Sequence, residues 1–213
     1  DDFLEGGEGD DTITGGTHGT EGDTVSYQGD TAAVNVELGG LALDGSGGKD
    51  TLVGIENIFG SVHDDTLVGD TGNNILWGNE GADNLDGSEG DDILSGGLGD
   101  DTLTGGPGGD TFLFEDSWGV DTINEIDDAS INTLDFSLAT GDLTFVIHAD
   151  GTVSAYDSVS TLDNISHISK IIGGQGNDHF FIERDSTNLP FIDGGPDGSD
   201  TIDYSDFIPE TTT

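Results

Sequence analysis

Aspartate recurs at a fixed interval through the middle of the chain, always in the same relation to glycine. Residues 60–113 divide without interruption into six segments of nine, GSVHDDTLV, GDTGNNILW, GNEGADNLD, GSEGDDILS, GGLGDDTLT and GGPGGDTFL. Position one of every segment is glycine, and position eight is leucine or phenylalanine. The position-six residues are Asp65, Asn74, Asp83, Asp92, Asp101 and Asp110. Carboxylate oxygens held at such a regular spacing indicate a framework that binds a hard divalent cation.

These segments resemble the RTX (repeat-in-toxin) nonapeptide G-G-x-G-x-D-x-U-x, a calcium-binding repeat. The same pattern begins at Gly6 and Gly173, and looser copies place Asp50, Asp121 and Asp200 at position six. The resemblance implies an all-β, right-handed parallel β-roll or β-helix solenoid with calcium ions bound in the turns between coils. RTX repeats occur in toxins, proteases, lipases, epimerases, adhesins and surface-layer proteins, so the resemblance leaves the activity of the whole protein open.

In such a fold the first six residues of a repeat form a turn and the last three form a short strand, so two repeats make one coil. Turns one coil apart stack at a distance of ~4.8 Å. The expected pairs of stacked side chains are Asp65 with Asp83, Asn74 with Asp92, Asp83 with Asp101, Asp92 with Asp110, and Asp101 with Asp121. Uncompensated carboxylates at this separation repel each other, and a divalent cation between them reverses the sign of the interaction.

Calcium suits these turns because it accepts several oxygen ligands in a flexible geometry, whereas zinc favours histidine or thiolate ligands. We expect main-chain carbonyls to complete the ligand shell, namely those of Gly81, Gly90, Gly99 and Gly108. Outside the central block, the predicted metal ligands are Asp11, Asp23, Asp50, Asp121, Asp178 and Asp200. About eight calcium ions are expected in total. The position-five residues Asp64, Asp91 and Asp100 are expected to be solvated or outside the first ligand shell.

The composition excludes several classes of protein. The chain has 45 acidic and three basic residues among 213, a formal net charge of −42, so binding to nucleic acid is not expected. There is no apolar run of the ~20 residues that a membrane span requires, so membrane insertion is not expected either. Without cysteine, neither a disulfide nor a thiolate site can form. Composition alone would indicate disorder, and the glycine–aspartate periodicity is what argues for a fold.

A second, longer repeat lies between the nonapeptide blocks. Asp23–Tyr27 (DTVSY) and Asn132–Phe136 (NTLDF) each precede an alternating apolar stretch, and DTIDYSDF from Asp200 is interpreted as a third copy that is cut short. In the second copy, Asp150-Gly151 predicts a β-hairpin whose two turn residues both have positive φ. Apolar residues recur every third position in Leu162, Ile165, Ile168 and Ile171. This spacing favours solenoid coils with bends, and a short helix after Ser160 is the alternative.

We therefore expect five segments in a chain that is a fragment of a longer tandem array. They are the end of an RTX block (1–22), an intervening β segment (23–59), an RTX β-roll block (60–124), an intervening β segment with a hairpin (125–172), and RTX repeats with the start of a further unit (173–213). One outward face of the central block is apolar, with Ile75, Trp77, Ile93 and Leu113. A neighbouring module of the same chain or a docking partner is expected to cover this face.

No catalytic site is predicted. The five histidines have no metal-ligand spacing, no serine stands in a nucleophile-elbow sequence, and carboxylates bound to calcium are poor acid–base catalysts. The expected function is a calcium-binding structural segment of a large secreted or cell-surface bacterial protein that folds outside the cell, as export of RTX proteins by type I systems implies. The alternative is a carbohydrate-binding or enzyme-associated RTX module of an extracellular polysaccharide-modifying enzyme, for which the chain offers little beyond Lys170, His167 and Arg184.

Overall fold

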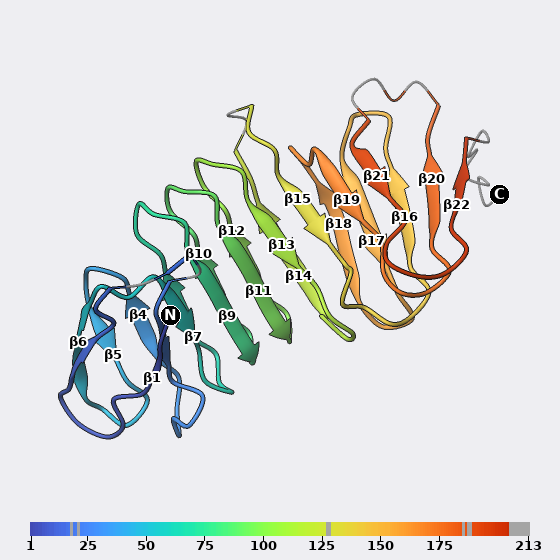
Figure 1. Ribbon diagram of the computed structural model, residues 1–213. Coiled ribbons are helices and arrows are strands. Elements are labelled where there is room, and N and C mark those ends of the chain that lie inside the picture. The colour runs from blue at the N-terminus through green and yellow to red at the C-terminus, as the bar shows by residue number, and fades with distance from the viewer. Residues whose placement is uncertain (18, 21, 127–128, 185, 187–188, 205–213) are drawn as a thin grey trace.

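The chain forms an elongated solenoid of strands (Figure 1). The structure is a computed structural model, and it describes residues 1–213 except 18, 21, 127–128, 185, 187–188 and 205–213. Within these described residues, 22 strands lie in two sheets that face each other across a thin core. The all-β fold with parallel strand pairing confirms the predicted fold class. None of the described residues forms a helix that is long and apolar enough to cross a membrane.

The first sheet contains nine strands in the spatial order β1-β3-β7-β9-β11-β13-β15-β19-β21. Their bounds are β1 Phe3–Leu4, β3 Thr24–Ser26, β7 Asn57–Phe59, β9 Ile75–Glu80, β11 Ile93–Leu98, β13 Thr111–Leu113, β15 Thr133–Asp135, β19 Lys170–Ile172 and β21 Phe191–Asp193. Every pair of neighbours in this sheet is parallel.

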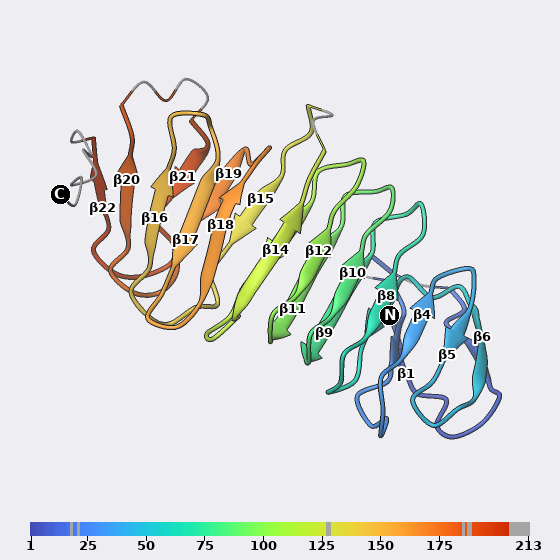
Figure 2. The same ribbon diagram turned by 180° about the vertical axis from the view of Figure 1, so that it is seen from behind.

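The second sheet contains thirteen strands in the order β2-β6-β5-β4-β8-β10-β12-β14-β18-β17-β16-β20-β22, and Figure 2 shows it as one row. Their bounds are β2 Thr12–Thr14, β4 Asn35–Glu37, β5 Ala42–Leu43, β6 Lys49–Val53, β8 Thr66–Val68, β10 Asn84–Asp86, β12 Thr102–Thr104, β14 Val120–Asn124, β16 Thr144–Ile147, β17 Val153–Tyr156, β18 Thr161–Ile165, β20 His179–Ile182 and β22 Thr201–Asp203.

The central coils stack in the register that the nonapeptide predicts. In the second sheet Leu85 pairs with Leu67 on one side and Leu103 on the other. In the first sheet Leu94 pairs with Leu76 and Phe112. All of these position-eight side chains are fully buried, because alternate residues of a strand point to opposite faces. One large apolar residue per strand is therefore the whole core of these coils.

Two antiparallel insertions interrupt the second sheet and share one topology. In the first meander (β4, β5 and β6), the outer strands pair in parallel with β8 and β2. In the second meander (β16, β17 and β18), they pair in the same way with β20 and β14. The shared topology agrees with the longer repeat expected from the sequence. The segment at Thr201–Asp203 differs, because it lies in the second sheet, whereas Thr24–Ser26 and Thr133–Asp135 lie in the first.

An aromatic cluster widens the core beside the second meander. It consists of the buried side chains of Phe114, Trp118, Phe136, Phe145 and Phe180. Phe136 is central, since its ring centroid lies 4.7 Å from that of Phe114, 5.1 Å from Trp118 and 5.2 Å from Phe145. Phe145 in turn stacks on Phe180 at 4.6 Å.

The local predictions for the second meander are confirmed with one correction. Strands β16 and β17 form the predicted antiparallel hairpin, but its turn is not the expected pair of positive-φ residues. Gly151 has φ 89°, whereas Asp150 is not among the residues with positive φ. His148 N–H donates to Thr152 O at 2.9 Å and Gly151 N–H donates to His148 O at 2.9 Å, so the loop has three residues and ends on a left-handed glycine.

The three-residue apolar spacing also corresponds to coils with bends. Leu162 and Ile165 lie in β18 of the second sheet, and Ile171 lies in β19 of the first. Ile168 is buried in the corner between these two strands. The alternative of a short helix after Ser160 is therefore wrong, because Thr161–Ile165 is a strand.

Candidate metal centres

Position-six side chains form two columns that follow the long axis of the solenoid. The first column precedes the strands of the first sheet and the second column precedes those of the second sheet. The first column runs through Asp23, Glu56, Asn74, Asp92, Asp110 and Asn132, and the second runs through Asp65, Asp83, Asp101 and Asp121. The structure thus brings together each pair of residues that the sequence predicted to stack.

One type of hydrogen bond links successive members of a column. The main-chain N–H of Asp83 donates to Oδ1 of Asp101 at 2.8 Å, and the N–H of Asp65 donates to Oδ1 of Asp83 at 2.7 Å. In the first column, Asp92 N–H donates to Asp110 Oδ1 at 3.0 Å. The same bond joins Asn74 to Asp92 and Asp101 to Asp121. One oxygen of each carboxylate is therefore used to hold the neighbouring coil.

The other carboxylate oxygen in the regular turns is left for a different partner. In Asp83, Asp92, Asp101 and Asp121, the Oδ2 atom is buried and has no hydrogen-bond partner among the described residues. The turns that end at these four aspartates are called the regular turns. The four side chains are at most 5% exposed. Burying an oxygen of a carboxylate without a partner is costly. The regular turns therefore each present one anionic oxygen that is suited to a cation.

In three less regular turns, a side-chain oxygen at position six accepts a hydrogen bond from a main-chain N–H of the same turn. Asp65 Oδ2 accepts the N–H of Ser61 at 2.5 Å, and Asp178 Oδ2 accepts the N–H of Gly174 at 2.6 Å. Asn74 Oδ1 accepts the N–H of Asp70 at 2.8 Å. Position six of these turns thus has a main-chain donor where the regular turns have none in the described structure. This difference separates two kinds of turn that the motif alone does not distinguish.

The glycines of the repeat make room for converging oxygens. A Cβ atom on Gly78, at position one, would lie 2.2 Å from Asp83 Oδ2 and 2.5 Å from the carbonyl oxygen of Gly96 in the next coil. A Cβ atom on Gly99, at position four with φ 140°, would lie 1.6 Å from the carbonyl oxygen of Gly81. Side chains at these positions would occupy the space into which the carboxylate and carbonyl oxygens point.

Burial of the columns works against ionisation of the carboxylates. Desolvation, reinforced by neighbouring aspartates, raises the pKa of Asp83 and of Asp92 to about 7. Desolvation likewise raises the pKa of Asp101 to about 6 and that of Asp121 to about 8. A cation placed between stacked carboxylates would favour their charged form and so offset this penalty.

The donor set of these turns fits calcium. All the converging atoms are carboxylate or carbonyl oxygens, which calcium prefers, and histidine and cysteine are not among them. Across the described part of the chain, no three side chains of His, Cys, Asp or Glu lie close enough to hold a metal ion on their own. A cation in these turns would therefore need main-chain carbonyls as well as carboxylates.

The predicted ligands at the two ends of the solenoid also lie in stacked pairs. Asp11 N–H donates to Asp50 Oδ1 at 3.0 Å, and Asp178 N–H donates to Asp200 Oδ1 at 3.0 Å. Asp23 is fully buried, accepts the N–H of Asp2 at 2.7 Å through Oδ1, and has no partner for Oδ2 in the described structure. Asp50 differs, because its Oδ2 accepts the hydroxyl of Tyr27 at 3.2 Å.

Sequence reasoning missed four polar residues that lie at or beside the columns. Glu56 and Asn132 occupy position six of the first column, and Asn132 could have been found by aligning NTLDF with DTVSY. Asp44 is 5% exposed and its Oδ2 lies beside Gly48 without a described partner. Although burial acts to raise it, hydrogen bonds from Gly48 and Ser46 lower the pKa of Asp44. Glu125 reaches Gly105, and no motif marks it.

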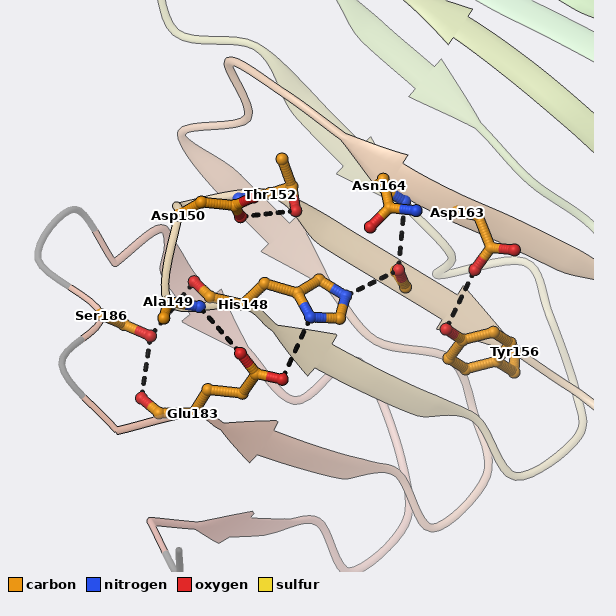
Figure 3. Close-up of polar contacts among 10 residues, drawn as sticks. His148, Ala149, Asp150, Thr152, Tyr156, Asp163, Asn164, Glu183 and Ser186 are labelled. Atoms are coloured by element: carbon orange, nitrogen blue, oxygen red, sulfur yellow. Dashed lines mark hydrogen bonds and ion pairs between the residues drawn. The ribbon is translucent and has the colours of Figure 1, made fainter. Parts of the chain in front are cut away.

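A second polar cluster lies at the end of the second meander (Figure 3). His148 Nε2 lies 2.9 Å from Ser154 Oγ, and His148 Nδ1 lies 3.3 Å from Glu183 Oε1. This is the order of groups used in nucleophilic catalysis. Ser154, however, is 1% exposed, and its Oγ also accepts the N–H of Asn164 at 3.1 Å. The cluster therefore joins the ends of four strands and does not present a hydroxyl to a substrate.

The comparison with protein families agrees with the geometry of the columns. The family model of the RTX calcium-binding nonapeptide repeat (4 copies) matches residues 1–17, 59–94 and 77–112. These residues therefore carry RTX calcium-binding nonapeptide repeats, and such repeats form a structural calcium-binding module of bacterial proteins. Among curated proteins, a search finds no match to this chain.

Proposed function

We propose that this chain is a calcium-stabilised structural segment of a large secreted or cell-surface bacterial protein and has no catalytic role of its own. Its stacked turns bind calcium, and ion binding supplies the free energy that the one-leucine core of the central coils does not. In a calcium-poor cytosol, repulsion among the acidic residues keeps the chain open, which suits export. In the calcium-rich exterior the chain folds.

One observation carries this proposal. Asp83, Asp92, Asp101 and Asp121 are buried, the Oδ1 atom of each accepts an N–H from the preceding coil, and the Oδ2 atom of each lacks a partner among the described residues. A position-one carbonyl of the next coil converges on the same space, as at Gly78 and Gly96. The proposed ligands are Asp83, Asp92, Asp101, Asp110 and Asp121 with main-chain carbonyls such as those of Gly81 and Gly96, and the pairs Asp11–Asp50, Asp178–Asp200 and Asp23 near the ends. About eight ions remain the expected number.

Neighbouring modules of the same protein are the proposed partners. The outer face of the first sheet carries half-buried Ile75, Trp77, Ile93 and Leu113, and Trp77 stacks on Phe59 with ring centroids 5.4 Å apart. A shallow depression beside Trp77 includes Val62 and Leu98. This face offers an apolar surface that an adjoining module could cover.

A matched pair of substitutions tests the proposal. Asp92→Asn keeps an oxygen for the N–H of Asn74 and removes the charge beside the proposed ion, whereas Asp91→Asn changes an exposed neighbour whose Oδ1 accepts the N–H of Gly109. Titration of the calcium-free chain, followed by β circular dichroism, should give a calcium midpoint about tenfold higher for Asp92→Asn than for wild type. Asp91→Asn should leave it near the wild-type value, and equal effects would contradict the ligand assignment.

A further inference from the structure

The last turn of the central block departs from the oxygen pattern of the others. In the regular turns, the position-one glycine faces the aspartate of its own turn and the carbonyl of the position-one glycine in the next coil. A Cβ atom on Gly87, for example, would lie 2.4 Å from Asp92 Oδ2 and 2.8 Å from the Gly105 carbonyl oxygen. The corresponding segment of the next coil, EIDDASIN from Glu125 to Asn132, contains no glycine in its sequence.

Glu125 supplies an oxygen at that place. A Cβ atom on Gly105 would lie 2.1 Å from Glu125 Oε1 and 2.4 Å from Asp110 Oδ2, so these two carboxylate oxygens converge as carboxylate and carbonyl do elsewhere. The N–H of Gly105 also donates to Glu125 Oε1 at 3.1 Å, whereas the N–H of Gly87 donates to the Thr104 carbonyl at 2.9 Å. The side chain of Glu125 thus takes over both contacts that the main chain of the next coil makes in a regular turn.

The charge of Glu125 also replaces one that the column loses. The residue stacked on Asp110 is Asn132, whose Oδ1 accepts the N–H of Asp110 at 3.0 Å. The amide group of Asn132 is neutral, and its Nδ2 donates to Glu125 Oε2. A turn with Asp110 and Asn132 alone would offer one negative charge, and Glu125 restores the two that stacked aspartates offer elsewhere.

We propose that Glu125 is a calcium ligand that completes the last site of the first column. Its Oε1 takes the place of the position-one carbonyl, and its charge takes the place of the aspartate that Asn132 replaces. The inference rests on the proposed function, since it requires calcium in the turn from Gly105 to Asp110. That turn lies within the residues that match the calcium-binding repeat, and Glu125 lies outside them. The assignment therefore extends the ligand set beyond the repeat.

Substitution of Glu125 tests the assignment on the full chain. After calcium removal, the ions bound at saturation are counted by equilibrium dialysis and elemental analysis, and affinities are measured by isothermal titration. Glu125→Ala should bind one ion fewer than wild type, or bind that ion at least about tenfold more weakly. Glu89→Ala removes the same side-chain type from an exposed position of the adjacent turn in the same column, and it should match wild type.

Glu125→Gln separates a ligand from a simple hydrogen-bond acceptor. The amide oxygen of glutamine can accept the N–H of Gly105 and can bind calcium as a main-chain carbonyl does, so this variant should keep the ion with a severalfold lower affinity. If Glu125 only accepts hydrogen bonds, Glu125→Ala will bind as many ions as wild type with unchanged affinities, and the assignment is wrong. Failure of wild type to bind calcium would instead overturn the proposed function itself.

Discussion

The central block and the second meander belong to one solenoid, but different interactions stabilise the two regions. In the central block, each strand buries one leucine or phenylalanine, and the turns bury aspartates such as Asp83 and Asp101. Beside the second meander, the equivalent of the position-six aspartate is apolar. Leu162 pairs with Asp121 of the preceding coil, and the N–H of Leu143 donates to Asp178 Oδ1 of the following one.

The aromatic cluster lies where the aspartates give way to leucines. Phe136, Phe145 and Phe180 are fully buried there, and each aromatic ring buries far more apolar area than a leucine. A solenoid coil can therefore be stabilised either from its turns, by a cation between carboxylates, or from its interior, by a wide apolar core. Under the proposed function this chain uses both means in adjoining regions, so the two regions should respond differently to the same perturbation.

Calcium removal should have the largest effect, and the loss of structure should be greater in the central block than in the second meander. Without the ion, the repulsion between the buried carboxylates of the central block is uncompensated. A site that is occupied at a thousandfold excess of calcium over its Kd contributes about 4 kcal/mol to the free energy of unfolding, and chelation removes this contribution. Amide hydrogen exchange after chelation should therefore lose protection by at least about a thousandfold in β10 and β12, and much less in β16 and β17, which do not follow a proposed ligand. Equal loss in both regions would contradict the comparison.

Phe136→Ala should produce the converse result. Phe136 contacts Phe114, Trp118 and Phe145, so its truncation leaves a cavity that costs about 3–5 kcal/mol. The loss should be seen in denaturant unfolding of the calcium-loaded chain, while the calcium midpoint of the central block stays unchanged. Phe191→Ala is the matched control, because Phe191 is 65% exposed and should cost less than about 0.5 kcal/mol. A shift in the calcium midpoint with Phe136→Ala would show that the regions are not separate.

Two glycines sharpen the comparison at the level of single turns. Gly99→Ala places a Cβ atom 1.6 Å from the Gly81 carbonyl oxygen at φ 140°, and should destabilise the calcium-loaded chain by about 3 kcal/mol. A Cβ atom on Gly141, in the loop before the second meander, would meet nothing within 4 Å, and Gly141→Ala should be neutral or stabilise by up to about 1 kcal/mol. Thermal unfolding in saturating calcium measures both, and similar losses would argue against tight turns being special to the central block.

The turns of the central block could be predicted from sequence because their structure is local and repeated. Gly78, Asp83 and Leu85 each have one position in the repeat and one role in the coil. Local sequence patterns also predict the bends at Ile165 and Ile168 and the hairpin at Gly151. They do not predict the order of the meander strands, because β6 pairs with β2 and β4 pairs with β8 across residues far apart in the chain.

Glu125 and Asp44 could not be predicted for a related reason. Neither stands at a repeat position. Glu125 contacts Gly105 only because the solenoid brings the two segments together, and Asp44, which accepts the N–H groups of its neighbours Ser46 and Gly48, lies near the carbonyl oxygen of the distant Gly9 for the same reason. The hairpin turn at Asp150-Gly151 was predicted in the wrong form because the dipeptide fits both a two-residue and a three-residue loop, and the pairing of His148 with Thr152 decides between them.

Acidification should reproduce a small part of the effect of calcium in the central block. Burial raises the folded-state pKa of Asp83 and Asp92 to about 7 and that of Asp121 to about 8, above the value of about 3.9 in an unfolded chain. A raised pKa stabilises the calcium-free fold fully below the pKa of the unfolded chain, and this contribution is lost as pH rises through about 6 to 8.

The chain freed of calcium on a chelating resin should therefore recover some β circular dichroism at pH 5.5, above its isoelectric point of about 4.1, relative to pH 8. The recovery should stay well below the calcium-loaded signal, because protonation removes the repulsion without joining the coils. An unchanged or weaker β signal at pH 5.5 would mean that carboxylate charge is not what opens these turns.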